Sequence, residues 1–208
     1  MLPFTAEQFF AVFARYNEAV WPAQVFAAAA GLVAVVLLFV RRRYSDRAIA
    51  LILAGMWLWT GVAYHGLFFA RINPLAHLFA ALFVGQAAML LWQAPRLRFA
   101  GAARSATAVS GALILYAAIV YPIVGMAAGH AYPAMPLFGV TPCPVTLFTF
   151  GLLLLAPSAP WPLFAIPFVW SLIGGSAAIL LDVPQDWPLL IAGLVSVGLR
   201  WVENRAKS

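Results

Sequence analysis

Long apolar runs, separated by short polar or proline-containing breaks, make up nearly the whole chain. A helix that crosses a bilayer needs about 20 mostly apolar residues, and seven runs reach or approach that length. They lie at residues 19–40, 47–69, 74–93, 105–125, 144–158, 162–181 and 187–202. This pattern predicts an all-α fold, a polytopic transmembrane helix bundle of about seven spans that forms one membrane domain over residues 1–208.

Residues 5–17, before the first span, follow a different pattern. Thr5 followed three positions later by Gln8 fits a capping box at the start of a helix. Apolar side chains then recur at helical spacing, at Phe9, Val12, Phe13 and Tyr16. We expect a short amphipathic helix on the membrane–water boundary, with a plain extension of the first span as the alternative.

Composition supports the membrane assignment. Hydrophobic residues make up 65% of the chain and charged residues only 9%, whereas soluble domains carry about 25% charged residues. The lipid bilayer is therefore the expected solvent and partner. The net charge of +6 does not indicate a nucleic-acid partner, because the basic residues form short clusters between apolar runs, as topology signals do. The only cysteine, Cys143, excludes an intramolecular disulfide.

Basic residues are distributed unevenly between the two sides of a seven-span topology. Ten of the twelve Lys and Arg residues fall on one side, and only Arg15 and Arg71 fall on the other. The ten lie at positions 41, 42, 43, 47, 96, 98, 104, 200, 205 and 207. Because loops rich in Lys and Arg remain in the cytoplasm, we predict an external N-terminus and a cytoplasmic C-terminus.

Polar side chains gather at the predicted outer ends of the spans, whereas the inner halves are almost purely apolar. Ionisable groups inside a membrane are costly and commonly functional. The candidates for binding a substrate or handling a proton are Glu18, Tyr64, His65, Arg71, Asn73, His77, Tyr121 and Asp182. We expect an outward-facing polar vestibule that binds a small solute or ion.

The hairpin between the second and third spans is the densest part of this group. Asn73 and His77 are four residues apart and share a helix face, while His65 lies one turn before the loop on the antiparallel partner. The two imidazoles could bind a metal or haem, or handle protons; otherwise they are boundary histidines that bond locally. Gln86 lies on the opposite face of the third span and could hydrogen-bond a neighbouring helix.

Acids at the same side give a further interpretation. Glu18 and Asp182 are the carboxylates expected at bilayer depth, and either could pair with Arg71. Such a pair could lock the bundle, gate access to the vestibule or hold an anionic substrate group.

Cys143 lies between Pro142 and Pro144 at the predicted start of the fifth span. The positive end of a helix dipole favours a thiolate there, so a reactive or metal-binding thiolate is one interpretation and a small apolar residue at a tight turn is the other. The candidate metal ligands are His65, His77, His130 and Cys143, although no pair has dedicated metal spacing. The proline-rich loop that carries His130 could fold over the vestibule as a lid.

Several function classes are excluded. No lysine lies in a span, so a retinal Schiff base is ruled out, and no phosphate-binding glycine loop or Ser-His-Asp set is present. We assign no catalytic residue, and the sequence requires no cofactor. The preferred function is a transporter or permease-like protein; the alternatives are a membrane-embedded metal- or haem-dependent redox protein, and a sensor or assembly factor. Glycines at 125, 129, 174 and 175 permit close helix contact and self-association into a homo-oligomer.

Three segments resemble an uncharacterised bacterial multi-pass inner-membrane family, a domain of unknown function. They are the N-terminal stretch from Leu2 to Asn17, the hairpin from Tyr64 to Pro74, and the segment Gly139-Val-Thr-Pro-Cys-Pro144. The resemblance covers nearly the whole chain. It implies a bacterial inner-membrane protein and carries no catalytic or binding residues with it.

Overall fold

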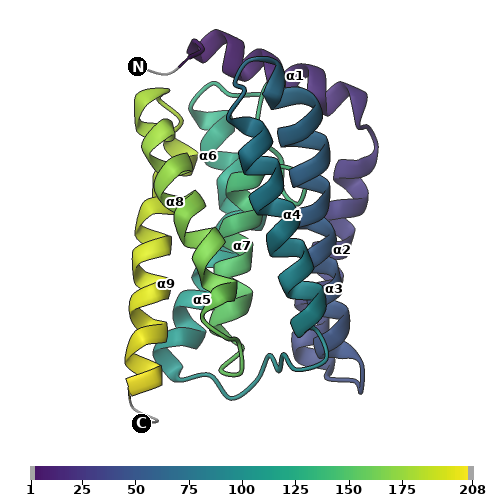
Figure 1. Cartoon of the computed structure of the whole chain (residues 1–208), viewed down its shortest axis with the longest axis vertical. Helices are drawn as coiled ribbons and strands as arrows, with labels where there is room; N and C mark the ends of the chain where they lie inside the picture. The colour runs from purple at the N-terminus through teal and green to yellow at the C-terminus, as the bar shows by residue number, and fades with distance from the viewer. Residues whose placement is uncertain (1–2, 206–208) are drawn as a thin grey trace.

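Helices account for nearly all of the regular structure in the computed structural model, which describes residues 3–205, and no β-strand occurs among those residues (Figure 1). The α-helices are α1 (Ala6–Ala19), α2 (Ala23–Val40), α3 (Ser45–Trp59), α4 (Ala76–Gln93), α5 (Arg104–Leu115), α6 (Tyr121–Ala127), α7 (Pro142–Leu154), α8 (Pro162–Leu180) and α9 (Pro188–Arg205). The chain also forms π-helical η1 (Thr60–Phe68) and η3 (Tyr116–Val120), and the 3₁₀ turns η2 (Phe69–Arg71) and η4 (Pro184–Asp186). The predicted all-α fold is confirmed. Two residues used above lie outside the described residues: Leu2, which is part of the family resemblance, and Lys207, which is part of the count of basic residues.

Within residues 3–205, five helical stretches are long and apolar enough to cross a membrane, by length and composition. They are Ala23–Val40, Ser45–Arg71, Ala76–Gln93, Arg104–Ala127 and Pro162–Leu180. These five match predicted spans. Of the other two, α7 is a shorter apolar helix, and α9 carries Arg200, Glu203 and Arg205 in its last turns.

The central helix is α7, in which every residue from Pro142 to Leu154 is buried. A helix surrounded by protein is apolar on all faces, and its two threonines satisfy their hydroxyls internally. Thr146 and Thr149 donate hydrogen bonds to the carbonyls four residues earlier, at 2.8 and 2.7 Å. Trp57 from α3 donates its indole N–H to the Thr149 hydroxyl at 2.8 Å. These threonines therefore fix helix packing in the middle of the bundle.

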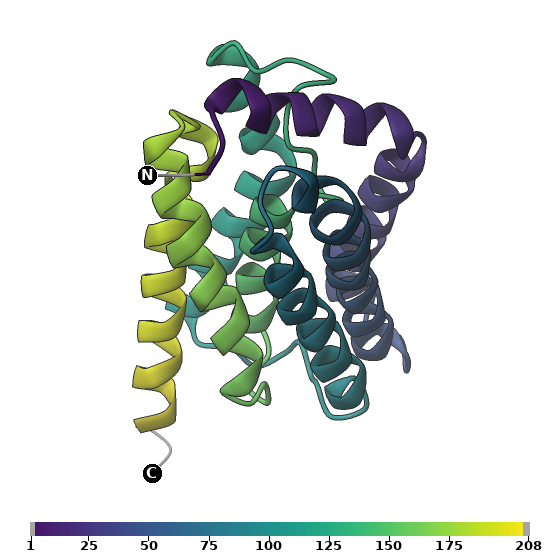
Figure 2. The same ribbon diagram turned by 45° about the horizontal axis from the view of Figure 1, so that its top comes forward.

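Helix α1 lies across one end of the bundle (Figures 1 and 2), which we call the α1 end. The predicted capping box is confirmed: the Gln8 amide donates to the Thr5 hydroxyl at 3.2 Å, and the Thr5 amide donates to Gln8 Oε1 at 2.9 Å. The predicted apolar stripe packs on protein, as shown by Phe13, whose ring stacks on Tyr64 at 5.2 Å. Helix α1 ends at Ala19 and α2 begins at Ala23, so α1 is a separate helix and not an extension of the first span.

Hydrogen bonds hold α1 on the bundle. The Tyr16 hydroxyl donates to the Val140 carbonyl at 2.7 Å and accepts from the Trp59 indole at 2.8 Å. The Asn17 side-chain amide donates to the carbonyls of Pro133 and Met135, both at 2.7 Å. Both side chains are buried, and a buried hydrogen bond of this kind contributes about 1 kcal/mol. Helix α1 and the loop between α6 and α7 therefore cover this end together.

The opposite end carries the basic loops. Figure 1 shows the α2–α3 loop, the α4–α5 loop and the end of α9 at the end away from α1. The nine described arginines of the predicted basic side belong to these segments or to the first turns of α3 (Arg47) and α5 (Arg104) that follow them. Arg15 lies on α1 and Arg71 lies in η2. The two ends of the bundle thus differ in charge as the sequence pattern predicts.

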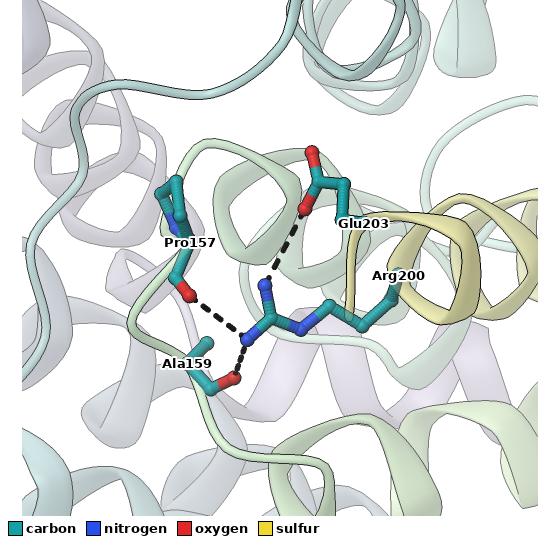
Figure 3. Close-up of polar contacts among 4 residues, drawn as sticks. All are labelled: Pro157, Ala159, Arg200 and Glu203. Carbon is teal, nitrogen blue, oxygen red and sulfur yellow. Dashed lines mark hydrogen bonds and ion pairs between the residues drawn. The ribbon is translucent and has the colours of Figure 1, made fainter. Parts of the chain in front are cut away.

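Arg200 joins α9 to the α7–α8 loop at this opposite end (Figure 3). Its buried guanidinium donates to the carbonyls of Pro157, at 3.0 Å, and Ala159. It also forms an ion pair with Glu203 at 3.4 Å. A hydrogen bond to a charged group contributes about 1.5–3 kcal/mol, so Arg200 stabilises the packing of the α7–α8 loop against α9.

Candidate functional site

A cavity of about 340 Å³ lies beneath α1. Its wall is mostly apolar, and it includes aromatic side chains from α1, η1, η2, α4 and α8, among them Phe9, Phe13, Tyr64, Phe69, Phe79 and Trp170. Four polar side chains also line it: Asn73, Cys143, Ser176 and Asp186. A concave, largely apolar space with a few convergent polar groups is the usual form of a small-molecule site.

Asp186 contributes a carboxyl group to the wall of this cavity. Its side chain is buried, with 3% of the residue exposed, and Tyr121 donates its hydroxyl to Oδ1 at 2.5 Å. The Cys143 thiol interacts with the same carboxyl. Among residues 3–205, no Lys, Arg or His forms an ion pair with Asp186.

Burial raises the pKa of the Asp186 carboxyl from 3.8 to about 6, and the contacts with Tyr121 and Cys143 oppose that rise. A carboxylate removed from water loses its hydration, and no cation among residues 3–205 pairs with this one in its place. The group is therefore a buried acid that changes charge near neutral pH.

The turn between α8 and α9 places this carboxyl. Pro184 starts the 3₁₀ turn η4, and the Asp186 amide donates to the Val183 carbonyl at 3.0 Å. The Gln185 carbonyl accepts from the Tyr116 hydroxyl at 2.9 Å. Asp182, at the end of α8, has a left-handed φ of 53° and an exposed side chain. The two acids of this turn therefore face different surroundings: Asp182 is exposed and Asp186 lines the cavity.

Two π-helical segments supply the tyrosines. Tyr64 belongs to η1 and lines the cavity, and Tyr121 follows directly after η3. A π segment inserts an extra residue in a turn, rotates the side chains that follow and frequently occurs at a functional site. Both tyrosines reach the cavity end of the bundle through such a rotation.

The three histidines lie apart. His65 is buried, and neither ring nitrogen has a hydrogen-bond partner in the described part of the chain. Its ring meets those of Phe83 at 4.7 Å and Trp170 at 4.9 Å edge to face. His77 is exposed. His130 stacks on a phenylalanine of α1 at 4.3 Å and lies 3.3 Å from the Gln185 side chain.

No metal-binding set is assembled from these residues. Among residues 3–205, no three His, Cys, Asp or Glu side chains come close enough to hold a metal ion. The candidates His65, His77, His130 and Cys143 therefore do not converge. The carboxyl beside Cys143 disfavours a thiolate electrostatically, so the geometry gives no support to a reactive thiol.

Of the other predicted site residues, Tyr64 and Asn73 line the cavity. Asn73 also accepts the Leu75 amide at 3.2 Å in an Asx turn. Arg71 is exposed, donates to the Leu67 carbonyl at 2.8 Å and forms no ion pair with Glu18 or Asp182, which are exposed as well.

Two further predictions concern neighbours of the cavity. Gln86 donates to the Leu163 carbonyl of α8 at 2.9 Å, which confirms the predicted bond to a neighbouring helix. Pro136, in the loop predicted to act as a lid, lines the cavity. That loop and α1 close the same space.

Sequence reasoning missed Asp186 and Trp170. Neither residue is among the site residues that the sequence predicts. The available signal was the short turn Val183-Pro-Gln-Asp-Trp-Pro188, in which two polar residues lie between two prolines. The Trp170 indole N–H is buried, lines the cavity and interacts with the Cys143 thiol.

Comparison with known proteins identifies one family. The family described as "Family of unknown function (DUF6064)" matches residues 6–208. No curated protein and no solved structure matches the chain.

Proposed function

The chain belongs to this family of unknown function, DUF6064, and we propose that it is a permease-like membrane protein that binds a small amphiphilic cation in the cavity beneath α1. The observation that carries the proposal is the buried Asp186 carboxyl, which no basic residue among residues 3–205 neutralises. Buried charges in proteins are normally paired. A ligand cation is the partner that this site lacks.

The aromatic wall favours the same ligand class. Phe13, Tyr64 and Trp170 belong to a larger set of rings that line the same cavity as the carboxyl. A cation over an aromatic face gains about 0.5–2 kcal/mol per favourable contact. Rings and one carboxylate together recognise an organic ammonium better than a bare metal ion, which needs several oxygen or nitrogen ligands.

The rim of the cavity supports a ligand with an apolar body. Leu75, Ile173 and Leu180 line the cavity and expose 61%, 37% and 70% of their surfaces. These side chains come from the end of α8 and the residue that precedes α4. In a membrane such a rim contacts lipid or its interface, so a ligand could enter from the bilayer side.

The membrane arrangement that accompanies this function is the seven-span one. We propose that α7 and α9 join the five longer stretches as spans, that α1 lies at the outer membrane–water boundary of a bacterial inner membrane, and that the C-terminus is cytoplasmic. The arginine-rich loops opposite α1 support this orientation. The cavity would then open outward, as expected for the binding site of a permease.

Binding of a matched pair of probes tests the proposal. Phenyltrimethylammonium and tert-butylbenzene share shape and differ in charge, and their affinities for the protein in nanodiscs can be measured by calorimetry at pH 8. Asp186→Asn should weaken binding of the cation at least tenfold, because it removes a buried counter-ion, and should leave binding of the neutral probe unchanged. Asp182→Asn, an exposed acid four residues away, is the matched control and should change neither.

Two further readouts separate binding from transport. Cation binding should weaken as the pH falls through about 6, since Asp186 then takes up a proton. Uptake of the cation into proteoliposomes should depend on the same carboxyl. Equal cation affinity for the protein and its Asp186→Asn variant would refute the binding site, and binding without uptake would refute the permease part alone.

A further inference from the structure

A second hollow, away from the first cavity, lies between α2 and α5. Its volume is about 620 Å³, and Phe138 and Phe148 are among the residues that line it. Helix α2 packs along α3 but leaves this groove open toward α5. The side chains along it that belong to α2 run from Ala28 to Phe39.

The groove has the length of one lipid leaflet. Ala28 and Phe39 are eleven residues apart on α2, which corresponds to about 16 Å at a rise of about 1.5 Å per residue. The hydrocarbon core of a bilayer is about 30 Å thick, so the groove covers about half of it. One acyl chain of a phospholipid spans that distance.

Along α5 and η3 the residues change from basic to hydroxylic to apolar. Arg104 begins α5, one turn before Thr107 on the same face. Thr107 and Ser110 line the groove, followed by apolar Ile114 and, in η3, Ala118. The Ser110 hydroxyl is buried and has no hydrogen-bond partner among residues 3–205. A phospholipid has the same order of chemistry: a charged headgroup, ester oxygens and then a hydrocarbon chain.

The mouth of the groove is positively charged. Arg41 ends α2 and donates from Nη2 to the carbonyl of Phe99, a groove residue, at 3.1 Å. Arg42 and Arg43 follow it and are exposed. Asp46 is the only acid in the α2–α3 and α4–α5 connections and the first turn of α3, and its carboxyl already accepts the Phe99 amide at 3.1 Å.

We propose that this groove binds one anionic phospholipid, with an acyl chain between α2 and α5 and its phosphate near Arg41 and Arg104. Basic pockets between membrane helices recognise anionic headgroups. The unpartnered Ser110 hydroxyl donates to an ester oxygen. The lipid fills a gap that the helices leave and ties α2 to the rest of the bundle.

Native mass spectrometry of the detergent-solubilised full chain tests the proposal, with palmitoyl-oleoyl phosphatidylglycerol and the phosphatidylcholine of the same chains as probes. One phosphatidylglycerol should stay bound at detergent concentrations that remove phosphatidylcholine. Gly111→Phe should reduce its retention about tenfold, since Gly111 lines the groove and an added Cβ there meets no atom within 4 Å, so the backbone accepts a side chain that fills the groove. Gly198→Phe on α9, where an added Cβ also meets nothing within 4 Å, is the control and should retain the lipid.

Charge variants test the headgroup contact. Replacing Arg41 and Arg104 together by Gln should reduce the preference for phosphatidylglycerol about thirty-fold, since each surface arginine strengthens attraction to anionic lipid about fivefold. The same change at Arg15 and Arg71, at the α1 end, should leave it intact. Equal retention of the two lipids, equal loss in Gly111→Phe and Gly198→Phe, or a dimer that Gly111→Phe dissociates would each overturn the proposal.

Discussion

Replacing Asp186 by Asn should make the protein more stable at pH 8. The carboxyl is buried without a basic partner among the described residues, and its pKa is raised from 3.8 to about 6. The folded state therefore holds this proton more tightly than the unfolded chain does. The stability that the proton contributes is complete below pH 3.8 and is lost as the pH rises through about 6.

The size of the effect follows from the two pKa values. Each pKa unit corresponds to 1.36 kcal/mol, so the ionised carboxyl at pH 8 lowers the free energy of unfolding by about 3 kcal/mol relative to the protonated one. Asparagine resembles the protonated acid in shape and charge. Its amide oxygen can still accept the hydrogen bond that Tyr121 donates to Asp186 Oδ1. Asp186→Asn should thus recover most of the 3 kcal/mol.

Thermal unfolding in detergent at one fixed scan rate is the assay. For chains of this length 1 kcal/mol corresponds to about 2–4 °C in Tm, so the variant should unfold up to about 6–12 °C higher at pH 8 and within about 2 °C of the parent at pH 4. Asp182→Asn should show neither change, because Asp182 is exposed and asparagine tolerates its positive φ. Lower stability of Asp186→Asn at pH 8 would refute the reasoning, because it would mean that a cation already pairs with the carboxylate.

Two further changes test packing at opposite ends of the bundle. Gly61→Ala should destabilise the protein by about 1–3 kcal/mol, because a Cβ at Gly61 would lie 2.9 Å from Phe83 Cβ. The control Gly55→Ala, whose added Cβ meets nothing within 4 Å, should be neutral or stabilising by up to about 1 kcal/mol. Chemical denaturation of both variants measures the difference. Arg200→Ala should lower the free energy of unfolding by about 2–4 kcal/mol, because two loop carbonyls lose a charged donor; a loss below about 0.5 kcal/mol would show that the loop does not depend on it.

The spans were predictable because their signal is local. Length and hydropathy alone locate α2, α4 and α8 within a few residues, and the Thr5 and Gln8 pair locates the start of α1. The grouping of arginines at one end of the bundle is likewise readable from the order of the clusters. Length and hydropathy could not give the position of a helix in the bundle: the sequence does not show that α7 is the helix buried on all sides.

The candidate site was predictable only in part, and the reason is helical phase. A helical wheel assumes 3.6 residues per turn, but η1 and η3 are π-helical, so a wheel drawn through them does not give the faces of the side chains that follow. Tyr64 and His65 are neighbours in η1, yet Tyr64 lines the cavity and His65 is enclosed by rings. Tyr121 follows η3 and meets Asp186, a partner 65 residues later in the chain.

Asp186 itself shows why depth along a span is a poor guide to burial. Asp182 ends an apolar run and therefore looked like the acid at bilayer depth, but the left-handed turn at that residue exposes it. The chain then folds back through η4, and this return carries Asp186 under α1. A buried acid without a basic partner lowers stability, and natural chains retain such costs chiefly at functional positions. Asp186, which the sequence did not indicate as a site residue, is therefore the strongest functional candidate among residues 3–205.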